Sequence, residues 1–318
     1  MLENPVPRKR VALIGECLIE LNGAASGNLR LAYGGDSLNT ALYLARLTRS
    51  TIGVKYVTVM GTDALTDAMM ANWRAEGIDT SLVLRDSTRL PGLYLIQVTD
   101  GGERSFLYWR AESAARYLLR HSAFDRVAAE LAQADLIYVS GISLAILPAE
   151  DRTRMLELLV RLAGRGIPIA LDSNYRASLW TSADLARSAL TALMPATRLM
   201  FATFDDEKCL WGDDTPETTR VRLHAAKVPI VTIKLGAAGC LYSDGIATTK
   251  VPAAAVATIK DTTAAGDAFN AGFLAGWLAD RTPEECCRAG NTLAGAVIQH
   301  HGAIIPAAAT PSLSELFP

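Results

Sequence analysis

Near its C-terminal end the chain reads Asp261-Thr262-Thr263-Ala264-Ala265-Gly266-Asp267 and continues directly into Ala268-Phe269-Asn270-Ala271-Gly272-Phe273-Leu274-Ala275-Gly276. The second stretch is apolar at helical spacing, so together they predict a loop of small residues that opens a helix. Small side chains leave the amides of Ala264, Ala265, Gly266 and Asp267 uncovered. Free amides at a helix N-terminus attract negative charge, so this stretch predicts an anion site.

Asp267 places a carboxylate at the mouth of that anion site, where it would repel a resting phosphate. Its position makes sense if it takes a proton from a hydroxyl group that attacks a phosphate, while the amides of 264–267 stabilise the developing charge. The simpler alternative is a helix cap, because aspartate commonly accepts hydrogen bonds from first-turn amides. A cap requires only the local Gly-Asp pair, so the choice depends on the rest of the chain.

Apolar runs alternate with amphipathic segments along most of the chain. We expect strands at 11–14, 55–60, 136–139, 167–171 and 230–233, and helices at 38–47, 64–76, 150–162, 182–193, 265–279 and 283–300. A further β segment is expected after 233 and up to 251. Buried strands alternating with helices predict an α/β fold with a mostly parallel sheet that is covered on both faces.

One region departs from this alternation. Residues 92–98 and 104–109 flank Asp100-Gly101-Gly102, which predicts a β-hairpin. Together with residues near 18–31, the hairpin is expected to form an antiparallel flap built from about 16–33 and 90–111. Such a flap would make a lid that excludes water from a phosphate. The whole would form one domain over 11–306, preceded by a flexible tail at 1–10.

The composition narrows the class of protein. The 318 residues carry 31 basic and 33 acidic side chains, a formal net charge of −2, so no nucleic-acid or membrane surface is expected. The first ten residues lack the apolar core of a signal peptide. We expect the five cysteines to be reduced, core-type residues of a cytoplasmic protein, because no pair has Cys-x-x-Cys spacing: Cys17, Cys209, Cys240, Cys286 and Cys287.

A second candidate site is Gly34-Gly35-Asp36-Ser37-Leu38-Asn39, just before the first long helix. Paired glycines let the backbone approach a ligand closely, and Asp36 and Asn39 offer acceptors and a donor suited to sugar hydroxyls. This motif and the one at 261–267 together resemble the paired motifs of the ribokinase (PfkB-type) carbohydrate kinase family. Ala264 stands where the family has glycine, which is tolerable only if position 264 does not need a positive φ.

The resemblance implies a ribokinase-like three-layer αβα sandwich with a small β lid. The N-terminal motif would hold the sugar, residues 264–266 would form an anion hole, and Asp267 would be the catalytic base. Further strings extend the resemblance over about 11–306: 15–20, 90–94, 102–110, 140–147, 172–176 and 302–306. They are most similar to the subgroup that phosphorylates the C6 hydroxyl of 2-keto-3-deoxy-D-gluconate, although that subgroup usually shows Tyr-Tyr-Arg where this chain has Tyr108-Trp109-Arg110.

On the sugar side, the resemblance assigns the pocket to Gly34, Gly35, Asp36, Asn39, Tyr94, Tyr108, Arg110 and Arg176. A planar guanidinium binds a carboxylate through two hydrogen bonds, so Arg110 and Arg176 are candidates for distinguishing a sugar acid from a neutral sugar. Arg176 could instead face nucleotide phosphates, and either arginine could make only an ordinary surface ion pair.

On the nucleotide side, the segment from Lys234 to Gly239 follows a predicted strand and resembles the family's ATP loop. The resemblance assigns ATP binding to Asn174, Lys234, Gly236, Gly239 and Asn291. Where the family often shows Asn-x-x-Glu, this chain has Thr203-Phe204-Asp205-Asp206, so Asp206 is the candidate to hold Mg²⁺ through a water. Phosphoryl transfer from ATP requires a divalent cation, and the resemblance also raises the requirement for a monovalent one.

Three other functions remain open at this point. A kinase for 2-keto-3-deoxygalactonate or fructose would use the same motifs. A nucleoside kinase is disfavoured because nucleosides carry no carboxylate for the two arginines, and a non-catalytic sugar-acid sensor is disfavoured because it has no use for a base at Asp267. The open edge of the lid could pair with a second subunit to form a homo-oligomer. The configuration at C4 of the substrate is not encoded in any of these motifs.

Overall fold

The computed structural model describes residues 9–23, 28–49, 51–98 and 104–317. The strands are β1 (Lys9–Ile14), β2 (Leu18–Asn22), β3 (Arg30–Gly34), β4 (Ile52–Gly61), β5 (Ile78–Asp79), β6 (Val83–Asp86), β7 (Gly92–Val98), β8 (Arg104–Trp109), β9 (Leu136–Ser140), β10 (Ile169–Asp172), β11 (Leu199–Thr203), β12 (Ile230–Lys234), β13 (Cys240–Ser243) and β14 (Thr248–Val251). The helices are α1 (Asp36–Thr48), α2 (Ala64–Ala75), α3 (Phe124–Leu131), α4 (Gly141–Ala145), α5 (Ala149–Ala163), α6 (Ala183–Leu193), α7 (Phe204–Trp211), α8 (Pro216–Ala225), α9 (Ala265–Leu278), α10 (Pro283–Val297) and α11 (Leu313–Leu316).

The main sheet has the strand order β14-β13-β12-β11-β10-β9-β1-β4-β5, with β6 also paired to β4. From β12 to β5 the neighbouring strands are parallel, whereas β13 and β14 are added antiparallel at one edge. The predicted α/β fold with a mostly parallel sheet is therefore confirmed. Lys9 and Arg10 already belong to β1, so the expected tail does not reach residue 10, and residues 1–8 lie outside the described ranges.

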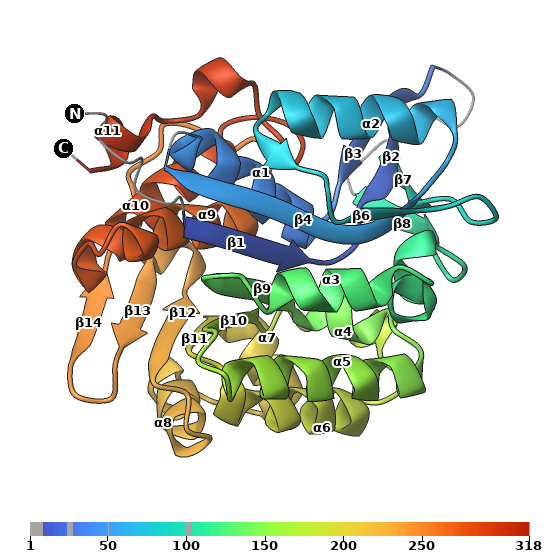
Figure 1. The fold of residues 1–318 in the computed structure, drawn as a ribbon. Helices are drawn as coiled ribbons and strands as arrows, with labels where there is room; N and C mark the ends of the chain where they lie inside the picture. The colour runs from blue at the N-terminus through green and yellow to red at the C-terminus, as the bar shows by residue number, and fades with distance from the viewer. Residues whose placement is uncertain (1–8, 24–27, 50, 99–103, 318) are drawn as a thin grey trace, which may run out of the picture.

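Helices cover both faces of the main sheet (Figure 1). Alternate residues of β1 point into different cores, as a strand with two buried faces requires. Val11 and Leu13 pack in a core with residues of α1, α9 and α10, while Ala12 and Ile14 pack in a second core with residues of α3, α5 and α6. On the first face α1 packs directly against α9, although the two helices lie more than 200 residues apart in the chain.

The strand order places a crevice at the carboxyl end of β1. The chain passes from β1 to β4 on one side and only later fills the other side with β9, so the connections diverge between these two strands. In open α/β sheets a ligand crevice forms at such a divergence, outside the carboxyl ends of the strands. Ser140, Asp172 and Lys234 end β9, β10 and β12, respectively, at this same edge.

A smaller sheet of four strands has the order β3-β2-β7-β8 and contains the segments expected to form a lid. The β2–β3 and β7–β8 pairs are antiparallel, but β2 and β7 run parallel, so the expectation of a purely antiparallel flap is wrong. The reason is topological: Leu18 lies opposite Gly92, so both strands start from the same end and leave the body in the same direction. The expected turn at 100–102 lies outside the described residues.

The apolar helices are short. The buried helices α9 and α10 have 14 and 15 residues, and across the described ranges no helix combines the length and apolarity that a membrane crossing needs.

All five cysteines are unpaired, as expected, and four of them are buried. Cys209 is the exception to the expectation of core-type residues, because it lies exposed on α7.

Candidate active site

A cavity of about 650 Å³ lies at the carboxyl ends of the parallel strands, between the main sheet and the smaller one. The structure brings every candidate residue to it, from segments spread over more than 250 residues. The candidates that line the cavity are Gly34, Gly35, Asp36, Asn39, Tyr94, Tyr108, Arg110, Asn174, Arg176, Asp206, Lys234, Gly236, Gly239, Ala264, Ala265, Gly266, Asp267 and Asn291.

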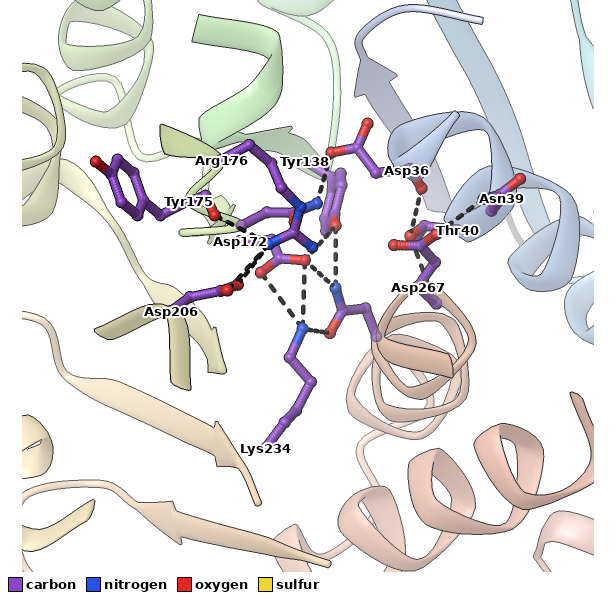
Figure 2. A network of polar contacts seen from close by, with 12 residues as sticks. Asp36, Asn39, Thr40, Tyr138, Asp172, Tyr175, Arg176, Asp206, Lys234 and Asp267 are labelled. Atoms are coloured by element: carbon purple, nitrogen blue, oxygen red, sulfur yellow. Dashed lines mark hydrogen bonds and ion pairs between the residues drawn. The ribbon is translucent and has the colours of Figure 1, made fainter. Parts of the chain in front are cut away.

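Asp267 is the third residue of α9, and the residue at the cap position is Ala264, which makes no side-chain capping bond. The carboxylate is buried, and its Oδ2 accepts a hydrogen bond of 2.8 Å from Asn39 Nδ2 on α1. Figure 2 shows these two side chains facing each other from their two helices. The carboxylate is thus directed to the sugar-side motif, which does not support the helix-cap alternative.

The surroundings of Asp267 favour its protonated form. Burial and the nearby carboxylates of Asp36 and Asp172 raise the pKa of Asp267 to about 7, while the hydrogen bond from Asn39 and the charge of Lys234 act in the opposite direction. A carboxyl group with a pKa near neutrality is ionised often enough to accept a proton and basic enough to hold it. This combination is the one that a general base requires.

The loop before α9 differs from its prediction at two residues. Ala264 adopts φ 62° and ψ 11°, so the condition that position 264 does not need a positive φ is not met. This left-handed conformation costs a non-glycine residue about 1–2 kcal/mol. The amide of Ala265 is also not free, since it donates to Thr262 O at 3.2 Å. The first helical bond runs from Ala268 N to Ala264 O at 2.9 Å, which leaves the later first-turn amides without an intrahelical acceptor.

Glycine serves a different structural purpose at each of positions 34 and 35 of the sugar-side motif. A Cβ on Gly35 would lie 2.1 Å from Glu16 O, so only glycine fits beside the end of β1. A Cβ on Gly34 would meet Tyr94 Oη at 3.5 Å and Asn39 Oδ1 at 3.7 Å, so its bare Cα opens space between these polar groups. Among the described residues Asn39 Oδ1 is buried and accepts no hydrogen bond. An unsatisfied buried acceptor at this place suits a ligand hydroxyl.

Asp36 begins α1 and faces the same space. Its Oδ2 accepts a hydrogen bond of 2.9 Å from Asn174 Nδ2, and burial raises the pKa of its carboxyl group. Asn174 follows β10 and has φ 32°, a conformation that asparagine tolerates better than most residues. The sugar-side and nucleotide-side candidates are therefore joined by a direct side-chain contact.

Arg110 is paired with the buried carboxylate of Glu16, so it does not make the surface ion pair that was the alternative to a ligand contact. Ser113 also donates to Glu16, and burial raises the pKa of this glutamate while the charge of Arg110 lowers it. The guanidinium lies 5.8 Å from the ring centroid of Tyr108. Its Nε is buried and has no hydrogen-bond partner among the described residues, so one donor remains for a ligand.

Arg176 and Asp206 are partners of one another. Arg176 Nη1 donates to the two carboxylate oxygens of Asp206 at 3.0 and 3.1 Å and to Tyr175 O at 2.9 Å (Figure 2). Half of the Arg176 side chain is exposed, and burial raises the pKa of Asp206. Within the described ranges no group of three or more His, Cys, Asp or Glu side chains is arranged to hold a metal ion. A divalent cation here would therefore need ligands from bound phosphates or water, which is the usual way that Mg²⁺ binds.

The expected ATP loop shows one clear glycine requirement. Gly239 has φ 89°, and a Cβ there would lie 2.1 Å from Val251 O, whereas Gly236 has φ 57° and open space around it. Asn291 Nδ2 donates to Val251 O and Pro252 O at 3.2 and 2.9 Å, so a contact with adenine would have to use its Oδ1. The glycines leave the backbone bare at this end of the cavity, which suits a flat ligand.

The sequence analysis assigned no role to Asp172 and Asn270, two polar residues that contact the predicted Lys234 at the centre of the site. Lys234 is buried, and its Nζ lies 3.3 Å from both carboxylate oxygens of Asp172 and 3.2 Å from Asn270 Oδ1. Asn270 Nδ2 in turn donates to Asp172 Oδ2 at 2.7 Å. A signal was present, because Asp172 follows a buried apolar run and Asn270 comes three residues after Asp267, on the same face of the helix.

Comparison with known proteins places these features in a family. The model of the pfkB family carbohydrate kinase matches residues 8–310. Over 97% of this chain and 99% of its own length, the 2-dehydro-3-deoxygluconokinase of Haemophilus influenzae is 48% identical, and that of Escherichia coli is 42% identical over 96% and 99%. A solved PfkB protein from Polaromonas, 24% identical, has the same fold, with a TM-score of 0.79 over 98% of this chain and 99% of that one.

Proposed function

Because this chain belongs to the pfkB family of carbohydrate kinases, we propose that it transfers the γ-phosphoryl group of ATP to the C6 hydroxyl of 2-keto-3-deoxy-D-gluconate. This substrate is the 2-dehydro-3-deoxygluconate for which its relatives are named. The products are 2-keto-3-deoxy-6-phosphogluconate and ADP. The observation that carries the proposal is Asp267, a buried carboxylate with a pKa of about 7 beside the first amides of α9.

The proposed chemical step begins with Asp267. Its ionised carboxylate accepts the proton of the C6 hydroxyl while the hydroxyl oxygen attacks the γ-phosphorus in line with the bond to ADP, which breaks. The first-turn amides at Gly266 and Asp267 stabilise the charge that develops on the transferring group. At pH 7 a group with this pKa is about half ionised, so the base is available without an external activator.

The sugar hydroxyls are held by α1 and the strands next to it. Asn39 donates to Asp267 and keeps its Oδ1 free among the described residues, so it accepts from a substrate hydroxyl and aligns it with the base. Asp36 offers a second acceptor, and the glycines at 34 and 35 let the sugar approach the backbone. Tyr94 and Tyr108, with ring centroids 5.8 Å apart, wall the pocket from the smaller sheet.

Arg110 selects the acid. It lies in the cavity with a buried donor at Nε, and Glu16 holds the rest of the guanidinium in place. A substrate carboxylate adds a second anion to this guanidinium, and such charge-assisted hydrogen bonds are among the stronger ones in proteins. Arg176 is more exposed and is paired with Asp206, so we assign it to the nucleotide phosphates or to the outer rim of the sugar site.

ATP occupies the remaining end of the cavity, next to Asn174, Lys234, Gly236, Gly239 and Asn291. Mg²⁺, bound through the phosphates and through water held by Asp206, would neutralise phosphate charge. The smaller sheet closes over the sugar and excludes water from the transfer. A monovalent cation requirement belongs to the same proposal and is tested by assaying the enzyme in potassium and in tetramethylammonium buffers.

We further propose that two copies associate through the outer edges of the lid. The edge strands β3 and β8 expose Leu31, Leu107 and Trp109 at 49%, 43% and 58%, respectively, and unpaired edges with apolar side chains favour strand pairing. A monomeric mass in sedimentation at micromolar concentration would contradict this. We place the protein in the cytoplasm, where five unpaired thiols are stable.

The deciding experiment is coupled ADP release with ATP and Mg²⁺ across a panel of acceptors: 2-keto-3-deoxygluconate, 2-keto-3-deoxygalactonate, fructose, ribose and adenosine. Turnover confined to the keto-deoxy acids supports the proposal, and the first two acceptors decide the tolerance at C4. Fast turnover of a neutral sugar or a nucleoside would keep the family and replace the substrate. Binding of the sugar acids without turnover of any acceptor would identify a sensor.

A further inference from the structure

We infer that Lys234 is a further residue of the phosphoryl-transfer machinery. Its buried ammonium lies against Gly266 in the loop at residues 264–267, called the amide loop below, and offsets the negative charge of the transferring group. The inference rests on the proposed kinase function and adds a role beyond the ATP loop. Lys234 ends β12, in the same row of strand ends as Asp172, and both line the cavity beside Asp267.

The ammonium lies directly beside the amide loop. A Cβ built on Gly266 would lie 3.3 Å from Lys234 Nζ, closer than most real Cβ contacts, so the ammonium lies against this part of the loop with no side chain between them. Glycine at 266 therefore does more than expose an amide, because any side chain there would stand between the cation and the backbone. In Figure 2 the Lys234 side chain extends toward Asp172 and the end of α9 that carries Asp267.

The charges in the cavity call for a cation at this place. Asp36, Asp172 and Asp267 bring three carboxyl groups to the centre of the site, and a nucleotide adds the charge of its phosphates. A helix N-terminus supplies only about half a positive charge. Of the other basic side chains that line the cavity, Arg110 is paired with Glu16 on the sugar side and Arg176 with Asp206 near the opening.

Asp172 and Asn270 hold the Lys234 ammonium in place through contacts that are longer than those of a tight ion pair. Its contacts with Asp172 and Asn270 are 3.2–3.3 Å, longer than the roughly 2.8 Å of a tight charge-assisted hydrogen bond. Asn270 also donates to Tyr138 Oη at 3.0 Å and to Asp172, so one side chain of α9 links β9, β10 and β12 beneath the loop. A fixed cation at the developing charge needs no reorganisation during the reaction.

The same ammonium acts on the base. The titratable groups that face Asp267 are Asp36 and Tyr43 from α1, Tyr138 from β9, Asp172 from β10 and Lys234 from β12. Of these, Lys234 is the group that lowers the pKa of Asp267, and the two carboxylates raise it. Removing the lysine alone should therefore move the acidic limb of the kcat/KM profile to higher pH.

The test compares Lys234→Met, Lys234→Arg and the double variant Lys234→Met/Asp172→Asn, with Lys250→Met on the exposed face of β14 as the control. The single Met variant leaves the buried Asp172 without its ionic partner and is expected to lower the melting temperature, whereas the double variant removes both charges and keeps the volume. Steady-state kinetics with 2-keto-3-deoxygluconate and ATP, a pH profile and a melting temperature are measured for each protein.

We expect the double variant to melt close to the wild type and to lose about 10²–10³-fold in kcat, the size of effect seen when one stabilising donor is removed, with the KM for the sugar acid unchanged. Lys234→Arg should recover part of that loss, and the acidic limb should move upward in Lys234→Met but little in the double variant. If the double variant folds and keeps a kcat within a few-fold of the wild type, Lys234 is only a structural ion pair.

If neither Met variant folds, Asn270→Ala provides the second test, because it removes one acceptor of the ammonium and keeps the charge. A lower kcat with an unchanged sugar KM supports the inference, and a wild-type kcat overturns it. The wild type, assayed alongside, separates this inference from the proposed function: no turnover by the wild type contradicts the function, whereas normal turnover by a folded double variant contradicts only the role of Lys234.

Discussion

Replacing Asp267 by asparagine should make the protein more stable and nearly inactive at the same time. The wild-type carboxyl group is buried beside Asp36 and Asp172, which raises its pKa from the ordinary 3.8 to about 7. At a pH where the carboxylate is ionised in both the folded and the unfolded chain, that rise in pKa lowers the free energy of unfolding of the wild type by about 4 kcal/mol. Because the carboxyl groups of Asp267 and Asp36 interact, the cost is shared between them, and we expect a measured gain of about 1–3 kcal/mol for Asp267→Asn.

The sign depends on pH in a defined way. Below about pH 3.8 the carboxyl group is protonated in the folded and the unfolded chain, so it costs no stability there; as pH rises toward 7 only the unfolded chain releases its proton freely, and the wild type loses stability. Urea denaturation at pH 5 and at pH 8 should therefore show a larger advantage for Asp267→Asn at pH 8. Asparagine keeps an oxygen that accepts from Asn39, so that contact is retained.

The activity of the same variant should fall by about 10²–10⁴-fold in kcat, the usual contribution of a positioned base. Asp214→Asn, in an exposed loop, is the matched control and should change the free energy of unfolding by less than about 0.5 kcal/mol at both pH values. The reasoning is refuted if Asp267→Asn is no more stable than the wild type at pH 8, or if its advantage is the same at pH 5. Retained turnover would remove Asp267 from the role of base.

Three further outcomes are expected. For the wild type, kcat/KM should fall about tenfold per pH unit below about pH 7, because Asp267 must be ionised to accept a proton; a profile flat from pH 5 to 8 contradicts this. Arg110→Ala should lower kcat/KM for the keto-deoxy acid by about 10–100-fold, in line with the loss of a hydrogen bond to a charged group, and leave any residual activity on fructose unchanged; equal losses for both acceptors would show that Arg110 does not recognise the carboxylate. Ala264→Gly should raise the free energy of unfolding by about 0.5–1 kcal/mol, since relief of the left-handed backbone exceeds the added chain entropy; a lower melting temperature than the wild type would contradict that account.

The fold was accessible to sequence reasoning because its signals are local. Short apolar runs such as 11–14 and 230–233 favour interior strands, and the expected helices at 64–76 and 265–279 agree with α2 and α9 to within one residue at each end. The direction of β2 relative to β7 was missed because it depends on where two distant segments leave the main sheet. A hairpin motif such as 92–109 fixes the pairing of its own two strands but not the direction of a third strand beside them.

For the candidate site too, the features carried by adjacent residues could be predicted, whereas those set by tertiary packing could not. The loop at 264–267 and the glycines at 34 and 35 carry their chemistry in adjacent residues, and all of them reach the cavity. The partners of the basic residues were not visible, because Glu16, Asp172 and Asp206 meet Arg110, Lys234 and Arg176 only through tertiary packing. The left-handed backbone at Ala264 could not be predicted, because an alanine in a sequence does not indicate a positive φ as a glycine does.

The packing of α1 against α9 has a consequence for how the protein is made. One core combines residues 11–83 and strand residues between 136 and 251 with residues 268–316, so the early strands and α1 emerge from the ribosome long before α9 and α10, which pack on the same core (Figure 1). At ordinary translation rates of 5–20 residues per second, the intervening stretch of about 180 residues takes roughly 10–40 s to synthesise. Throughout that interval an apolar face of the nascent chain is exposed, and Asn39 has no Asp267 to contact. The enzyme therefore becomes competent in its final moments of synthesis, and a truncation before α9 would lose solubility together with catalysis.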